Sequence, residues 1–227
     1  MTDLSLLHHA KSRYGQEFLL LAVLFFANDF GYIWVSHLPD YLYNFHIIQL
    51  VIITFFVTMI SRPDRGAFNV QAEELRITRV LSYTVGAFAV GVICHYATEG
   101  LLPDFPQTDG WYSLPRIEDP DTAFYDLTIV LVFSAIVDEV VFRRMAIQWL
   151  ENRVQNRWLL ILIPAALFGL SHWGAGIDEV LGAFAFGIVL TTIYLKVRRL
   201  WPVVLANYAT AVIVYGPESY GMVDLPF

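Results

Sequence analysis

Long apolar runs separated by short polar segments dominate this chain of 227 residues. A helix needs roughly 17–20 mostly apolar residues to cross the hydrocarbon core of a bilayer, which is about 30 Å thick. Runs of this length predict seven membrane-spanning helices, near residues 17–36, 42–60, 80–98, 124–142, 158–174, 178–195 and 200–216. We therefore expect an all-α integral membrane protein, built as a bundle of about seven transmembrane helices.

The composition agrees with a membrane protein. Hydrophobic residues make up 57% of the chain and charged residues only 15%, whereas soluble globular domains carry about 25% charged residues. The sequence has no internal repeat, low-complexity tract or basic patch, which indicates one domain of several spans and no nucleic-acid partner. Cys94 is the only cysteine, so no internal disulfide is possible. The first apolar run begins near Glu17 and is as long as a full span, so we expect no cleaved signal peptide.

The basic residues indicate the orientation of the spans. Cytoplasmic segments next to membrane spans are enriched in Lys and Arg. The predicted spans place thirteen of the fourteen basic residues on one side of the membrane and only Arg116 on the other. This asymmetry predicts a cytoplasmic N-terminus and an exterior C-terminus, and we expect the cytoplasmic membrane of a bacterium or archaeon. The exterior side holds the longest loop, residues 99–124, which is acidic and contains several prolines.

Two acids, Asp138 and Glu139, and two arginines interrupt the apolar run FSAIVDEVVFRRMAIQWL at residues 133–150. An ionisable group at membrane depth costs at least about 2.5–3.5 kcal/mol, so it usually faces a cavity or a partner and indicates a functional site. The alternative is that the fourth span ends near Val137 and the charges lie in a hydrated cytoplasmic loop. The next residues, MAIQWL, remain apolar, which favours a helix that continues to about Leu150.

If the helix continues, the two carboxylates have different surroundings. Glu139 and Arg143 are four residues apart and share a face, where an ion pair lowers the cost of burying either charge. Asp138 is rotated by about 100° from Glu139. We therefore expect Glu139 to pair with Arg143, and Asp138 to face a neighbouring helix across an intramembrane polar cavity.

The next span carries a candidate partner, His172, in the segment ALFGLSHWG. In a hairpin of two antiparallel helices, residues equally far from the turn lie at equal depth. Residue 155 stands midway between Asp138 and His172, within the polar segment ENRVQNR. His172 should therefore lie level with the acidic pair, with Phe168 one turn away on the same face. A single histidine near a helix end is more often structural than catalytic, but the equal depth favours a shared site.

The last predicted span carries two polar residues, Asn207 and Thr210, in the segment LWPVVLANYATA. Both side chains can form hydrogen bonds between the helices of a bundle. A structural role and a role in the site are therefore equally supported for this pair.

Together these motifs resemble the CPBP intramembrane proteases, a family that includes the CAAX prenyl endopeptidases and the bacteriocin-processing and immunity proteins. The family pattern is Glu-Glu-x-x-x-Arg, then Phe-x-x-x-His, then His-x-x-x-Asn or Asp, each on a membrane helix. The first motif corresponds to DEVVFR at residues 138–143 and the second to FGLSH at residues 168–172. Phe184 and Gly187 match a Phe-x-x-Gly helix of the family. The resemblance covers roughly residues 124–215.

Two positions depart from the family pattern. The first acidic position, which supplies the general base in the family, is Asp138, and aspartate is one methylene shorter than glutamate. In the third motif, alignment on LWP puts Asn207 in place of the histidine and Ala211 in place of the final Asn or Asp. A shift of four residues aligns Asn207 with the final Asn but puts Val203 at the histidine position. In either alignment one polar group of the family site is missing.

The resemblance implies hydrolysis of a peptide bond within the membrane, by a water molecule that a carboxylate activates. A carboxylate in a low-dielectric cavity is a better base than one in water. His172 would orient the water or the oxyanion, and Asn207 would donate to the developing oxyanion. The implied catalytic residues are Asp138, Glu139, His172 and Asn207, with Arg143 and Phe168 in support.

The sequence contains few features of a catalytic metal site. It contains no His-Glu-x-x-His motif, and Asp138 and Glu139 should diverge on the helix, so the three protein ligands of a catalytic zinc ion are hard to assemble. We therefore expect a metal-free, glutamic-type site without a cofactor, with a divalent metal as the alternative. Ser171 is not expected to be a nucleophile, because it should point away from its neighbour His172 on a helix.

The resemblance divides the chain into three parts. Residues 1–123 hold three spans and the acidic exterior loop, residues 124–216 form a protease-like core of four spans, and residues 217–227 are a short exterior tail. The expected partners are the lipid bilayer and a membrane-embedded or membrane-associated peptide or protein substrate. The alternative function is a degenerate scaffold or immunity-type protein that binds a peptide or helix without cleaving it. A small transporter with a proton relay is less consistent with the sequence, which has no repeat of broken helices.

Overall fold

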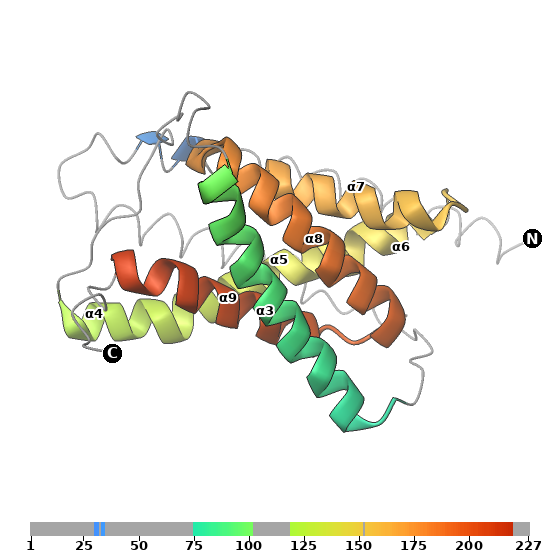
Figure 1. Ribbon diagram of the computed structural model, residues 1–227, viewed down its shortest axis with the longest axis horizontal. Coiled ribbons are helices and arrows are strands. Elements are labelled where there is room, and N and C mark those ends of the chain that lie inside the picture. The colour runs from blue at the N-terminus through green and yellow to red at the C-terminus, as the bar shows by residue number, and fades with distance from the viewer. Residues whose placement is uncertain (1–29, 32, 35–74, 102–118, 152, 220–227) are drawn as a thin grey trace, which may run out of the picture.

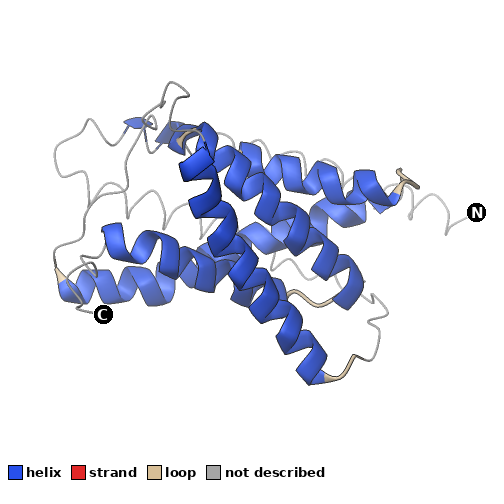
Figure 2. Ribbon diagram, in the orientation of Figure 1, coloured by secondary structure: helices blue, strands red, loops and turns tan. Residues whose placement is uncertain are grey.

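The computed structural model describes residues 30–31, 33–34, 75–101, 119–151 and 153–219. Every regular element among these residues is helical (Figure 2). The expectation of an all-α protein is therefore confirmed for the described part of the chain. The predicted spans 17–36 and 42–60 lie outside the described residues, apart from a few helical positions between 30 and 34.

The helices of the described part form five long segments, which are α3, the run from α4 to α6, α7, α8 and α9. Elements α4 to α6 follow one another without a gap and make one continuous helical segment, which contains two π-helical stretches. In chain order the elements are α3 (Ile77–Leu101), α4 (Pro120–Tyr125), η2 (Asp126–Val130), α5 (Leu131–Asp138), η3 (Glu139–Met145), α6 (Ala146–Glu151), α7 (Arg157–Leu170), η4 (Trp173–Ala175), α8 (Ile177–Val197) and α9 (Trp201–Ser219).

The segment that carries the acidic pair is helical from residue 120 to residue 151. Asp119 caps its start, because its carboxylate accepts a hydrogen bond from the Thr122 amide at 2.8 Å, and Pro120 occupies the first helical position. The helix passes through Asp138 and Glu139 without a break. The predicted continuation to about Leu150 is therefore confirmed, and the alternative of a hydrated loop after Val137 is wrong.

Helix α7 is shorter than the predicted span 158–174. Asn156 caps its start by accepting a hydrogen bond from the Trp158 amide at 2.9 Å. The helix ends at Leu170, and the chain then turns through His172 and the short η4. Gly176 has a φ of 126°, which side chains rarely adopt, and this lets the chain enter α8. The prediction that His172 lies within a helix is therefore wrong.

Helix α8 packs against both α7 and α3, and α9 packs against α3 and α5 (Figure 1). Helices α7 and α8 approach closely, because a Cβ atom at Gly169 would lie 2.7 Å from the Val180 carbonyl oxygen. A Cβ atom at Gly187 would lie 3.0 Å from the Ala165 Cα atom. Gly187 of the Phe-x-x-Gly motif therefore permits close helix packing. The buried core collects apolar side chains from α3 and from α5 through α9.

Two helices of the described part are long and apolar enough to cross a membrane, over Ile77–Thr98 and Ile177–Val197. Helix α7 is apolar but has 14 residues. Large apolar side chains are exposed on α3, among them Leu81, Val85 and Ile93, as expected for a surface that contacts lipid. The count of seven spans stays a prediction, because two of them lie outside the described residues.

Candidate active site

A cavity of about 130 Å³ lies among α3, α5, α7, α8 and α9. The side chains that line it are spaced three or four residues apart along each long helix, so each helix turns one face to the cavity. Asp138 at the end of α5 and His172 after α7 both line it. Helix α9 contributes Asn207, Thr210, Ala211, Val214 and Tyr215.

One amide group contacts both members of the acidic pair. The Asn207 Nδ2 donates to Glu139 Oε1 at 3.1 Å and to Asp138 Oδ2 at 3.4 Å. We expected the two carboxylates to diverge, with Asp138 alone facing a neighbouring helix, and this expectation is wrong. A π-helical stretch begins at Glu139, and its wider turn places both carboxylates within reach of Asn207. Asp138 lines the cavity, and Glu139 is fully buried beside it.

The predicted ion pair is present. The Arg143 Nε lies 3.2 Å from Glu139 Oε2, and neither side chain has exposed surface. The guanidinium carbon of Arg143 lies 4.2 Å from the centre of the Phe168 ring, a cation–π contact. Phe168 therefore covers the positive end of the ion pair, and the pair offsets part of the cost of burying two charges.

His172 contacts the residue one turn before it. Its ring packs edge-on to the Phe168 ring with the centroids 4.9 Å apart, and its Nδ1 lies 2.9 Å from the Phe168 carbonyl oxygen. A carbonyl oxygen can only accept, so Nδ1 carries the hydrogen, and Nε2 of the neutral ring is an acceptor. Ser171 donates to the same carbonyl at 2.7 Å, and its Oγ lies 3.3 Å from His172 Nδ1. Ser171 and His172 are therefore in contact, contrary to our expectation, because they lie in a turn and not within a helix.

The hairpin between α6 and α7 has the predicted register. Phe142 and Phe168 stand equally far from residue 155, and their rings pack edge-on with the centroids 5.6 Å apart. The same symmetry relates Asp138 to His172, and both side chains line one cavity. The reasoning from equal depth therefore placed Asp138 and His172 correctly in one cavity, although His172 lies beyond the end of α7.

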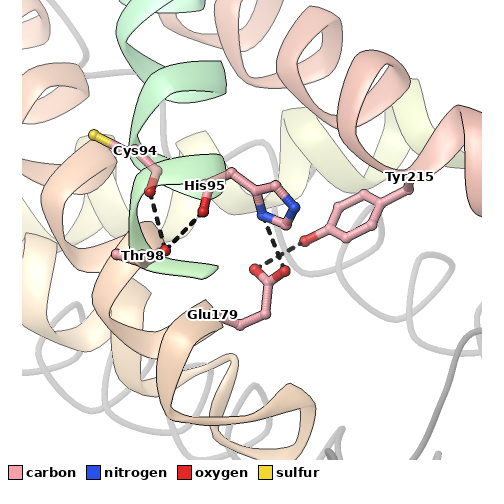
Figure 3. Close-up of polar contacts among 5 residues, drawn as sticks. All are labelled: Cys94, His95, Thr98, Glu179 and Tyr215. Atoms are coloured by element: carbon pink, nitrogen blue, oxygen red, sulfur yellow. Dashed lines mark hydrogen bonds and ion pairs between the residues drawn. The ribbon is translucent and has the colours of Figure 1, made fainter. Parts of the chain in front are cut away.

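A second polar cluster lines the cavity and was missed in the sequence. It consists of His95 on α3, Glu179 on α8 and Tyr215 on α9 (Figure 3). Each of these residues stands near the same end of a predicted span, at the exterior side in the predicted orientation. Ionisable residues at matching depth within spans were the signal that could have identified the cluster.

Metal ligands do not gather in the described part of the chain. No group of three or more His, Cys, Asp or Glu side chains there is close enough together to hold a metal ion. The two neighbouring carboxylates of Asp138 and Glu139 both accept a hydrogen bond from the Asn207 amide.

Comparison with known proteins identifies the family of the core segment. Residues 120–213 match the model of the Rce1-like family, described as type II CAAX prenyl endopeptidase Rce1-like. No curated protein and no solved structure matches the chain. The matched segment contains all six residues singled out above, from Asp138 to Asn207. The resemblance to the CAAX prenyl endopeptidases is thus confirmed for this segment.

Proposed function

We propose that this protein is an intramembrane endopeptidase. It hydrolyses a peptide bond with a water molecule that a carboxylate activates. Residues 120–213 match the model of the type II CAAX prenyl endopeptidase Rce1-like family, and this match supports the proposal. One observation carries this proposal. The Asn207 Nδ2 donates both to the Glu139 carboxylate, at 3.1 Å, and to the Asp138 carboxylate, at 3.4 Å, and these two acids have different surroundings.

Asp138 is the general base of the proposed reaction. Glu139 is fully buried and is paired with Arg143, so its negative charge is already balanced. Asp138 faces the cavity and accepts a hydrogen bond only from Asn207 among the contacts described for its carboxylate. As the water oxygen attacks the carbonyl carbon, Asp138 takes one proton from the water. That proton then passes to the nitrogen of the leaving amine when the carbon–nitrogen bond breaks.

The contacts of Asn207 favour a positioning role. An amide nitrogen has two hydrogens, and here both are directed at carboxylates. Asn207 therefore orients Asp138 rather than donating to the oxyanion, which was the role expected from the sequence. His172 fits the other role expected from the sequence, which is to orient the water, because its Nε2 is not used by the Phe168 carbonyl and can accept a hydrogen bond from the water.

The reaction is metal-free in this proposal. The carboxylates are held by an amide and a guanidinium, and this arrangement supports base catalysis by Asp138 directly. A chelator such as EDTA should leave cleavage by the purified protein unchanged. Loss of cleavage with EDTA and its return with a divalent cation would reverse this assignment.

The test of the function is cleavage of a defined peptide. The purified protein in lipid nanodiscs is incubated with an octapeptide ending in S-farnesyl-Cys-Val-Ile-Met, and with the same peptide without the farnesyl group. We expect cleavage by the wild type, none by Asp138→Asn, and wild-type rates for Thr192→Val, an exposed position on α8. Binding of either peptide without cleavage would favour the scaffold instead. Cleavage of both peptides alike would retain the endopeptidase and exclude recognition of the prenyl group.

A further inference from the structure

The cluster of His95, Glu179 and Tyr215 ties three helices together at one end of the cavity. The His95 Nδ1 lies 3.1 Å from Glu179 Oε1, and the Tyr215 hydroxyl donates to Glu179 Oε2 at 3.4 Å (Figure 3). The side chains of His95 and Glu179 keep 23% and 17% of their surface exposed. The carboxylate is therefore held from two sides and still reaches solvent-accessible space.

This cluster and Asp138 stand at opposite ends of the cavity. Along the lining face of α9, Asn207 and Tyr215 are eight residues apart, which corresponds to about 12 Å of helix. Asn207 contacts Asp138, and Tyr215 contacts Glu179. A direct proton transfer needs hydrogen-bond distance or one intervening water, and the helical rise between the two contacts on α9 is several times longer, which favours separate roles for Asp138 and the cluster.

The size of the cavity matches a chain of water molecules over that distance. Its volume for water-sized probes is about 130 Å³, and one water needs about 10–15 Å³ of such volume, so several waters fit. Three or four waters at hydrogen-bond spacing of about 2.8 Å, with a hydrogen bond at each end of the row, span about 11–14 Å. Hydroxyl groups of Ser134 and Thr210 and the His172 ring line the stretch between the two ends. Buried waters need two to four such polar partners each.

We propose that the cavity is a water path, which runs from the cluster of His95, Glu179 and Tyr215 to Asp138. Each hydrolysis consumes one water, and the hydrocarbon core of a bilayer supplies none. Glu179 keeps the outer end of the path polar, and His95 and Tyr215 hold its carboxylate in place. The use of this water rests on the proposed function, whereas the path itself can be tested without any cleavage.

The path is tested by the reaction of a buried thiol with Ag⁺ ions. Ala211 lines the cavity between its two ends, and Cys94 is the only cysteine. The full chain carrying Cys94→Ala and Ala211→Cys is placed in sealed vesicles of each orientation and exposed to Ag⁺, and protection of the thiol from maleimide is measured after denaturation. We expect rapid protection only when Ag⁺ is added on the side at which α9 ends.

A matched pair of further substitutions tests whether the cavity is the route. Val214 is buried and lines the cavity, and its neighbour Ile213 is 45% exposed. Val214→Phe fills the outer half of the cavity and should slow the protection by tenfold or more. Ile213→Phe adds the same ring on the outside and should change it less than twofold. Equal rates in these two variants, no protection from either side, or protection from the other side alone would overturn the path.

Cleavage gives an independent measurement of the same path. Glu179→Gln should lower kcat about tenfold with KM unchanged, since the substitution affects the supply of water and not the binding of the peptide. An increase in KM at unchanged kcat would assign the cluster to substrate binding and overturn the path. If the chain with Cys94→Ala and Ala211→Cys shows the expected Ag⁺ protection but the wild type shows no cleavage, the proposed function fails and the water path stands.

Discussion

The Arg143 Nε lies 3.2 Å from Glu139 Oε2, and both side chains are fully buried. The guanidinium also lies over the Phe168 ring at 4.2 Å. A single charge in such surroundings carries a large desolvation cost, which the opposite charge and the ring partly offset. The two residues therefore depend on each other for their place in the core.

Removal of the positive charge should destabilise the protein strongly. Arg143→Leu leaves Glu139 buried without its partner, and breaking a buried pair in this way costs about 3–5 kcal/mol of the free energy of unfolding. Thermal unfolding in detergent measures the loss. Arg153→Leu is the control, because Arg153 is exposed and contacts Trp149 at the surface. The double variant with Glu139→Gln should be more stable than Arg143→Leu, and an equal loss in both would contradict the pair.

Two glycines should respond in opposite directions to alanine. A Cβ atom at Gly169 would lie 2.7 Å from the backbone oxygen of Val180, so α7 and α8 must move apart. We expect Gly169→Ala to lower the free energy of unfolding by about 1–3 kcal/mol. A Cβ atom at Gly86 on α3 would meet nothing within 4 Å. Gly86→Ala should therefore raise the free energy of unfolding by about 0.5–1 kcal/mol. Thermal unfolding of the two variants tests this prediction. Destabilisation by both substitutions would contradict the difference in packing between Gly169 and Gly86.

The sequence was sufficient for the features that local spacing determines. The separation of four residues between Glu139 and Arg143 predicted their ion pair, because a helix repeats at about that interval. Equal distances from residue 155 placed His172 near Asp138, because antiparallel helices joined by a short turn have a fixed register. These features follow from positions within one hairpin.

Features that join distant segments could not be predicted in this way. The end of α7 at Leu170 is a local feature that was missed, although the residues after it, Ser171, His172 and Gly174, do mark a turn. The contact of Asn207 with both carboxylates depends on how α9 packs on the segment 120–151. Glu179 binds His95 and Tyr215 from two other helices, and nothing in the spacing within one helix brings these residues together.

The orientation of the chain in the membrane is a separate prediction. Thirteen of the fourteen basic residues fall on one side of the predicted spans, which should be the cytoplasm. A reporter fused after Phe227 should therefore be active outside the cytoplasm, and one inserted in residues 62–76 should be active inside. If both reporters are found on the same side of the membrane, the count of seven spans is wrong.

The two acids should differ in how substitution affects activity and stability. Asp138→Asn removes a charge that faces the cavity and barely changes the volume, so the free energy of unfolding should hold or rise while cleavage disappears. Glu139→Gln removes the partner of Arg143, so thermal stability should fall. Cleavage of the farnesylated octapeptide and thermal unfolding are measured on the same samples. Full cleavage by Asp138→Asn together with none by Glu139→Gln would make Glu139 the base.

Asn207 should show an order of stability that shape alone does not predict. Its Nδ2 donates at 3.1 Å to Glu139 and at 3.4 Å to Asp138. Asn207→Asp keeps the shape but replaces the donor with a third carboxylate beside two others, and like charges at this distance repel. Asn207→Ala loses hydrogen bonds to charged groups, which are worth about 1.5–3 kcal/mol each, without adding a charge.

We therefore expect thermal stability to fall in the order wild type, Asn207→Ala, Asn207→Asp, although aspartate is closer to asparagine in shape. Both variants should also cleave the farnesylated octapeptide more slowly, because Asp138 loses the group that orients it. Thr192→Val is the control, since the Thr192 hydroxyl is exposed and donates within its own helix to the Ile188 carbonyl at 2.7 Å. If Asn207→Asp is as stable as the wild type, the two carboxylates do not share this amide, and the assignment of Asn207 as the residue that positions the base fails.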